Sequence, residues 1–191
     1  SFLIFIISFM GPTILLQDAP VLPRTLVSFS VIMVIIAIPI MHFAPRLKYA
    51  ALIPVIASLA FSAQLGNTMK AQQEYEDFVF NMIAQDIANH KNIVSIGTVG
   101  QLNANERAKL IIENKPLVGY FVFPATEFLA SFQLINKGLL QTQHGYSDVQ
   151  ENKNKLANMI SKGIKPVSSN QYYSLFISDN TAIVFLGKYN N

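Results

Sequence analysis

The residue types that most often perform chemistry are few in this sequence and lie far apart. None of its three histidines, His42, His90 and His144, has a second histidine three or four residues away, which is the spacing that metal sites on helices use. The sequence has no cysteine, which excludes disulfide bonds and thiolate chemistry. We therefore expect neither a bound metal nor a cofactor.

Three short clusters resemble catalytic motifs and have simpler interpretations. Residues 144–148, HGYSD, contain the residue types of a catalytic triad, but sequence neighbours rarely point at one another, so a polar turn is expected. Residues 97–100, GTVG, lack the glycine spacing and the lysine of phosphate loops, which favours a strand-to-helix turn. The acidic residues Glu74, Glu76 and Asp77 have helical spacing and indicate a solvated helix face. The catalytic residues are unknown from the sequence.

Arg24 is the best candidate for ligand binding. It ends the loop 17–24, which also contains Asp18 and lies between two strongly apolar runs. The planar guanidinium group of arginine matches the oxygens of a phosphate, so Arg24 is a candidate for binding the phosphate of a lipid-linked donor. The alternative is an arginine that anchors the chain at a membrane interface.

The elements that would position such residues begin with three apolar runs, 2–16, 25–41 and 49–65. The chain of 191 residues is 51% hydrophobic and only 13% charged, with a mean hydropathy of +0.36, and the runs approach the length that spans a bilayer. Buried helices of a globular domain are the alternative, but such helices normally carry a polar stripe. We predict about three transmembrane helices in residues 1–65.

Charges in the loops predict the orientation of these helices. The loop 42–48 contains Arg46 and Lys48, whereas the loop 17–24 contains one basic and one acidic residue, so the first is assigned to the cytoplasm. Residues 66–191 would then be extracytoplasmic. That part is nearly neutral, with eleven basic and ten acidic residues, which argues against nucleic-acid binding. A chain that starts with Ser inside an apolar run is expected to be a piece of a longer protein.

Residues 66–191 have the periodicity of a small α/β domain. Apolar residues at three- and four-residue steps predict a helix from Gly66 to about Ile87, and a helix is expected at 107–114, after a cap in the segment 103–106, NANE. Further helices are expected at 126–140 and from 147 or 148 to 161. Strands are predicted at 92–97 and 117–123, and a hairpin at 172–177 and 181–186. The predicted order is β-α-β-α-α-β-β.

The junction of the two parts carries a family resemblance. Segment 62–78, SAQLGNTMKAQQEYEDF, resembles the end of the phage-type O-antigen glucosyltransferases, the glucosyl transferase Gtr type II family. A predicted strand that ends in Ile96-Gly97, and Lys115-Pro116-Leu117-Val118 before Pro124, agree with it. The resemblance spans most of the chain but corresponds only to the C-terminal part of such a protein.

The resemblance implies a multi-spanning enzyme of the bacterial inner membrane with GT-C-like architecture. Such an enzyme transfers glucose from undecaprenyl-phosphate-glucose to O-antigen polysaccharide, with a periplasmic C-terminal domain. Its essential acidic residues are expected in early outer loops, so this fragment alone is expected to be inactive. The partners are therefore the lipid bilayer, the polyprenyl-linked glucose and the polysaccharide. The main alternative is a non-catalytic, membrane-anchored extracytoplasmic binding or sensory module; a transporter subunit would need ionisable residues inside the apolar runs.

Overall fold

The computed structural model describes residues 38, 49, 52–90 and 92–188. Contacts divide the chain into two compact units, each described here by itself. Unit 1 comprises residues 1–68 and 111–122, and unit 2 comprises residues 69–110 and 123–191. The site discussed below lies entirely in unit 2.

The prediction of three membrane helices is wrong for the described part of the chain. The apolar run 49–65 overlaps the N-terminal part of α3, Leu52–Ala88, which continues without a break through the predicted amphipathic helix. Polar residues from Gln64 to Lys70 follow the aliphatic turns, and Pro54 lies in the first turn, where proline is tolerated. Among the described helices, none combines the length and apolarity needed to cross a bilayer. The predicted membrane helices 2–16 and 25–41 lie outside the described residues, apart from Ile38.

Unit 2 is built on a mixed four-stranded sheet. Its strands are β1 (Ser95–Gly100), β2 (Ser168–Ser169), β3 (Tyr173–Ser178) and β4 (Thr181–Leu186), in the order β1-β4-β3-β2. β1 and β4 are parallel, whereas β3 pairs antiparallel with β4 and β2. The predicted hairpin is confirmed as β3 and β4, and its turn places Asp179 at a positive φ of 51°, which Asp tolerates better than most residues.

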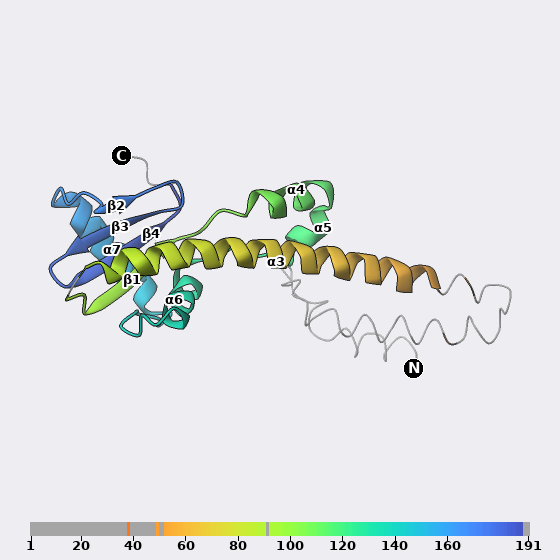
Figure 1. Cartoon of the computed structure of the whole chain (residues 1–191), viewed down its shortest axis with the longest axis horizontal. Coiled ribbons are helices and arrows are strands. Elements are labelled where there is room, and N and C mark those ends of the chain that lie inside the picture. The colour runs from red at the N-terminus through yellow and green to blue at the C-terminus, as the bar shows by residue number, and fades with distance from the viewer. Residues whose placement is uncertain (1–37, 39–48, 50–51, 91, 189–191) are drawn as a thin grey trace, which may run out of the picture. The chain divides into compact units, whose positions relative to one another are not determined.

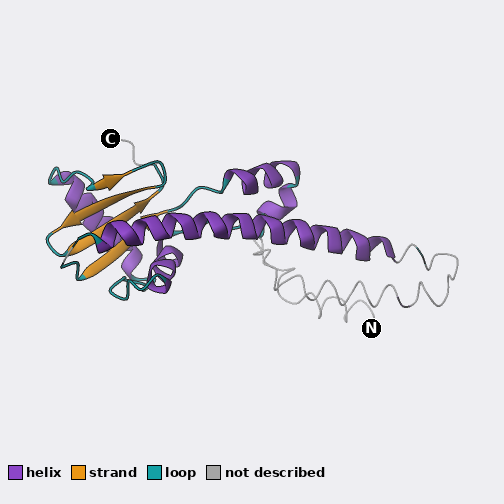
Figure 2. Cartoon of the chain, viewed as in Figure 1, coloured by secondary structure: helices purple, strands orange, loops and turns teal. Residues whose placement is uncertain are grey.

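Helices cover both faces of this sheet, as Figures 1 and 2 show. On one face, Val79, Phe80 and Ile83 of α3 pack with alternate strand residues such as Leu175 and Val184. On the other face, α7 (Asp148–Ser161) packs Leu156 and Met159 against strand residues of opposite parity, including Phe176 and Ile183. The two-residue alternation along each strand thus gives the sheet two buried faces. α6 (Glu127–Asn136) adds Ala130 and Leu134 to the first core.

The predicted strand at 117–123 is instead the short helix α5, Pro116–Gly119, and the turn that follows it. Buried residues there are Val118, Phe121 and Val122, whereas Leu117 and Tyr120 are exposed. This three- to four-residue step is helical, and Pro116 occupies the first helical position, which proline favours. The observed order is therefore α-β-α-α-α-α-β-β-β over the described residues, and the predicted order is wrong. The predicted helices at 107–114, 126–140 and 147/148–161 correspond to α4 (Glu106–Asn114), α6 and α7.

One polar contact ties α3 to the sheet and predicts a stability effect. The Tyr173 hydroxyl donates to Asp86 Oδ2 over 2.7 Å, and burial, aided by this hydrogen bond, raises the pKa of Tyr173 above its usual value. We expect Tyr173→Phe to lower the free energy of unfolding by about 1–2 kcal/mol near neutral pH. The raised pKa favours the neutral phenol in the folded chain, so this contribution is complete below about pH 10 and declines above it. Denaturant unfolding at pH 8 and pH 11 measures both effects, with Tyr146→Phe, at an exposed site, as control.

A charge-balanced cleft at the end of β1

The candidate functional site is a cleft at the carboxyl end of β1. Its volume is about 760 Å³. The cleft lies where β1 ends and where α6 and α7 begin, which is the place where open sheets with parallel strands most often bind ligands. The lining residues are Gly100, Gln101, Thr126, Glu127, Phe128, Tyr146, Val149, Gln150 and Lys153.

The floor of the cleft is fixed by hydrogen bonds between β1 and the start of α6. The buried hydroxyl of Thr98 donates to the Glu127 carbonyl oxygen over 2.7 Å and lies 3.0 Å from Ser131 Oγ. Gln101 pairs with Thr126 in an isolated antiparallel bridge. Gly100, at a φ of +89°, turns the chain there, and a Cβ would lie 2.7 Å from the Leu186 carbonyl oxygen, so only glycine fits.

An ion pair crosses the cleft. Lys153 Nζ of α7 lies 2.7 Å from Glu127 Oε1 of α6, with the side chains 46% and 24% exposed. Among the residues that line the cleft, these two are the only charged ones, so their charges balance. Gln101, Gln150 and Thr126 add amide and hydroxyl groups that can both donate and accept hydrogen bonds.

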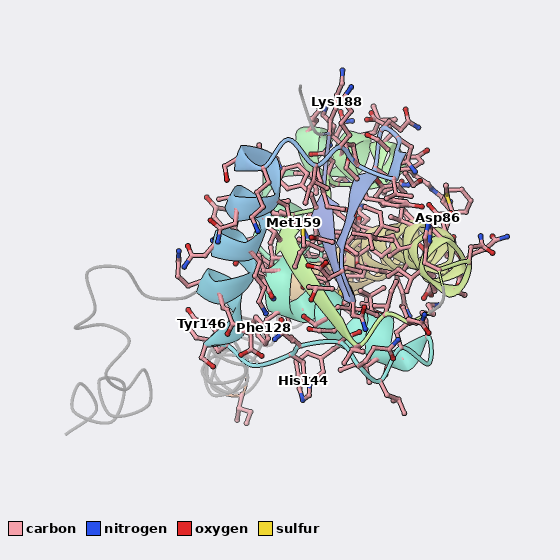
Figure 3. The ribbon with its side chains drawn as sticks, turned by 90° about the vertical axis from the view of Figure 1, so that its left-hand side faces the viewer. Asp86, Phe128, His144, Tyr146, Met159 and Lys188 are labelled. Atoms are coloured by element: carbon pink, nitrogen blue, oxygen red, sulfur yellow. The ribbon has the colours of Figure 1, made fainter. Side chains whose placement is uncertain are left out.

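Four rings extend from the cleft across the adjoining surface, and we call them the ring row. Tyr146 and Phe128, which line the cleft, meet edge to face at 5.8 Å between centroids. Phe128 meets Phe132 at 6.0 Å, and Phe132 meets His144 at 5.6 Å. Phe132, His144 and Tyr146 are exposed, and Figure 3 shows Phe128, His144 and Tyr146 at one edge of unit 2.

The loop that carries Tyr146 is held by the first residue of α7. Asp148 Oδ2 accepts a hydrogen bond from the Gly145 amide over 2.9 Å, and the Asp148 amide donates to the Gly145 carbonyl oxygen. His144 Nδ1 lies 3.1 Å from the Thr142 carbonyl oxygen. These contacts fix the backbone on both sides of the ring, although the Tyr146 side chain itself is 83% exposed.

Gln72 and Glu76 form a buried polar pair on α3 that binds the residue next to the cleft. Glu76 Oε1 accepts hydrogen bonds from the Ala125 amide over 2.8 Å and from Gln72 Nε2 over 2.7 Å, and Gln72 Oε1 accepts one from the Asn105 amide over 2.8 Å. Ala125 directly precedes Thr126 of the cleft. The prediction that the acidic run is a solvated face is therefore wrong for Glu76, which is 9% exposed, whereas Glu74 and Asp77 form ion pairs with Lys70 and Lys137 near the surface.

Of the described residues singled out in the sequence, Gly100 and Tyr146 line the cleft and His144 belongs to the ring row, whereas the others lie elsewhere. Arg24 and His42 lie outside the described residues. His90 contacts the Asp86 carbonyl oxygen at the end of α3. The segment 97–100 belongs to β1, so its interpretation as a strand-to-helix turn is wrong, whereas residues 144–147 form a loop and turn as expected and Asp148 begins α7.

Sequence reasoning missed the cleft and the ring row. The available signal was the pair Phe128 and Phe132, four residues apart on a predicted helix and therefore on one helix face. Nothing local indicated that the loop of Tyr146 would return to the same helix. Lys153 and Glu127 are likewise joined only by the tertiary fold.

Over the described ranges, no three His, Asp or Glu side chains lie close enough together to hold a metal ion. The cleft is thus characterised by amides, rings and one ion pair. No protein-family model matches the chain, and no curated protein and no solved structure matches it either.

Proposed function

We propose that this chain is the C-terminal part of a bacterial membrane glucosyltransferase and that its α/β unit binds the acceptor, the O-antigen polysaccharide. The observation that carries the proposal is the cleft, whose lining combines two aromatic rings with amide, hydroxyl and paired charged groups. A sugar has the matching chemistry, because its C–H faces pack on aromatic rings and its hydroxyls both donate and accept hydrogen bonds.

In the proposed reaction, an acceptor hydroxyl attacks C1 of glucose in undecaprenyl-phosphate-glucose. The new bond joins the acceptor oxygen to C1, the bond from C1 to the phosphate oxygen breaks, and the hydroxyl proton passes to a base. The cleft supports the binding part of this reaction, since its one carboxylate, Glu127, is paired with Lys153. Its role is to hold the acceptor in place, which lowers the entropic cost of the transfer.

Two observations support the membrane setting. Segment 62–78 resembles the end of such transferases, and it lies within α3. The N-terminal turns of α3 expose Ile53, Ile56 and Leu59 to 64–67%, with no charged residue between positions 52 and 69. An exposed aliphatic surface of this kind is suited to contact with lipid. The proposed location is the inner membrane, with the α/β unit in the periplasm.

Deleting the gene that encodes this chain in its host tests the proposal. We expect the O-antigen to lose glucosyl residues, as measured by composition analysis and mass spectrometry, and the wild-type gene to restore them. Gln150→Ala and Lys153→Ala should restore less glucose, because both side chains line the cleft. Lys162→Ala, at the far end of the same helix, is the matched control and should restore it fully.

Unchanged O-antigen glucose after the deletion would overturn the transferase proposal. The alternative of a sensory or binding module predicts that outcome, together with altered expression of other genes on addition of the polysaccharide. The two readouts therefore separate the two functions.

A further inference from the structure

The ring row extends beyond the cleft, and a single monosaccharide in the cleft would leave part of it unused. Two of its four rings line the cleft, while Phe132 and His144 lie outside it. Each ring touches the next edge to face, so the four form one continuous surface with its first part at the cleft. A ligand that covers all four rings must therefore extend beyond the cleft.

The composition of this surface favours a sugar chain over an apolar partner. Three of the four rings are well exposed, and the cleft at one end offers Gln101, Gln150 and Thr126 for hydrogen bonds. An apolar protein partner would bury these polar groups without partners, which is costly. A chain of sugars instead presents C–H faces to the rings and hydroxyls to the amides.

The charges indicate which sugar chain fits. Glu127 and Lys153 neutralise each other at 2.7 Å, and no other charged residue lines the cleft. A uronate or a phosphate-bearing sugar would have to compete with Glu127 for the ammonium group and would meet a carboxylate of the same sign. An uncharged sugar meets neither obstacle.

We propose that the cleft and the ring row together form one extended subsite for a segment of uncharged polysaccharide, several sugars long. The inference rests on the proposed function, because it names the class of acceptor that the same site takes. One part of the segment lies in the cleft beside Tyr146 and Phe128, and its continuation lies over Phe132 towards His144.

Direct binding tests this inference on the full chain. The probes are lipid-A-free O-polysaccharides from a panel of strains, half of them uncharged and half containing uronic acid, and the readout is affinity electrophoresis or calorimetry. We expect at least one uncharged polysaccharide to bind. Phe132→Ala and Tyr146→Ala should each weaken that binding by about three- to tenfold, the range expected for loss of one aromatic contact. Phe132→Tyr and Tyr146→Phe keep a ring and should retain binding.

Phe123→Ala is the matched control, because Phe123 is an exposed aromatic residue of unit 2 outside the ring row. Glu127→Gln tests the role of charge: it leaves the Lys153 ammonium group without its carboxylate partner, so uronate-containing polysaccharides should gain affinity relative to uncharged ones. Failure of every uncharged polysaccharide to bind, or equal effects of Phe132→Ala and Phe123→Ala, would overturn the extended subsite. Loss of O-antigen glucose on gene deletion would still stand in that case, so the two proposals can fail separately.

Discussion

Replacing Glu76 with alanine should lower the free energy of unfolding of unit 2 by about 3 kcal/mol. The Glu76 carboxylate accepts hydrogen bonds from the Ala125 amide and from Gln72, and both donors lie away from water. The substitution leaves these two donors without an acceptor, and each unsatisfied buried group costs about 1–3 kcal/mol. The measurement is denaturant unfolding of the full chain, followed by circular dichroism.

Two variants make this prediction specific to the buried contact. Glu74→Ala removes a carboxylate from the same helix two residues away, but that side chain is 63% exposed and its ion pair with Lys70 spans 3.8 Å, so the change should stay within about 0.5 kcal/mol. Glu76→Gln retains an oxygen that can accept both hydrogen bonds and should cost less than Glu76→Ala. Equal effects of Glu74→Ala and Glu76→Ala would refute a supporting role for the pair.

Glu76→Ala should also make the backbone next to the cleft more mobile. Ala125 precedes Thr126, and the Leu102 amide donates to the Ala125 carbonyl oxygen over 3.0 Å, so the Gln72–Glu76 pair helps hold the floor of the cleft. Gln72 also holds the Asn105 amide at the start of α4. Faster hydrogen exchange at Ala125 and Leu102 than at the β3 amides in Glu76→Ala would demonstrate this local role.

The helix cap and the hairpin could be predicted because each depends on residues that are close in sequence. Asn105 caps α4 through its side-chain oxygen, which accepts from the Arg107 amide, and the β3–β4 hairpin has an Asp-Asn turn between two apolar runs. These features depend on residues a few positions apart. Both were therefore correctly predicted from the sequence.

The structure of segment 117–123, the burial of Glu76 and the cleft depend on tertiary contacts between residues far apart in sequence. A short apolar run such as 117–123 fits a strand or a helix equally well. In the fold, burial of Val118 and Phe121, three residues apart, favours the helix. Glu76 has the spacing of a solvated residue, yet it is buried because the Ala125 amide, 49 residues away in sequence, supplies its partner. The cleft is equally non-local, because Glu127 and Lys153 belong to different helices.

Gly97→Ala should lower the free energy of unfolding by about 1–3 kcal/mol, the usual cost of overpacking a core. Gly97 lies in β1, where α7 packs against the sheet. A Cβ added there would lie 2.6 Å from Asn152 Cγ and 2.8 Å from Ile183 Cδ1, and still closer to Asn152 Oδ1. Asn152 is 2% exposed, so its side chain has little room to move aside. Thermal unfolding of the full chain measures the effect.

A double-mutant cycle with Asn152→Ala identifies the cause. Asn152 Oδ1 is buried without a hydrogen-bond partner, so Asn152→Ala removes an unsatisfied oxygen together with the atoms that meet the new Cβ. In the Asn152→Ala background, the decrease in the free energy of unfolding caused by Gly97→Ala should be smaller than in the wild type by at least about 1 kcal/mol. Gly66→Ala is the control of opposite sign: nothing lies within 4 Å of a Cβ at this α3 position, so the helix should gain about 0.5–1 kcal/mol. The placement of Lys153 beside Glu127 depends on the close approach of α7 to β1. If Gly97→Ala lowered the free energy of unfolding equally in both backgrounds, the contact between Gly97 and Asn152 would not be what sets that approach.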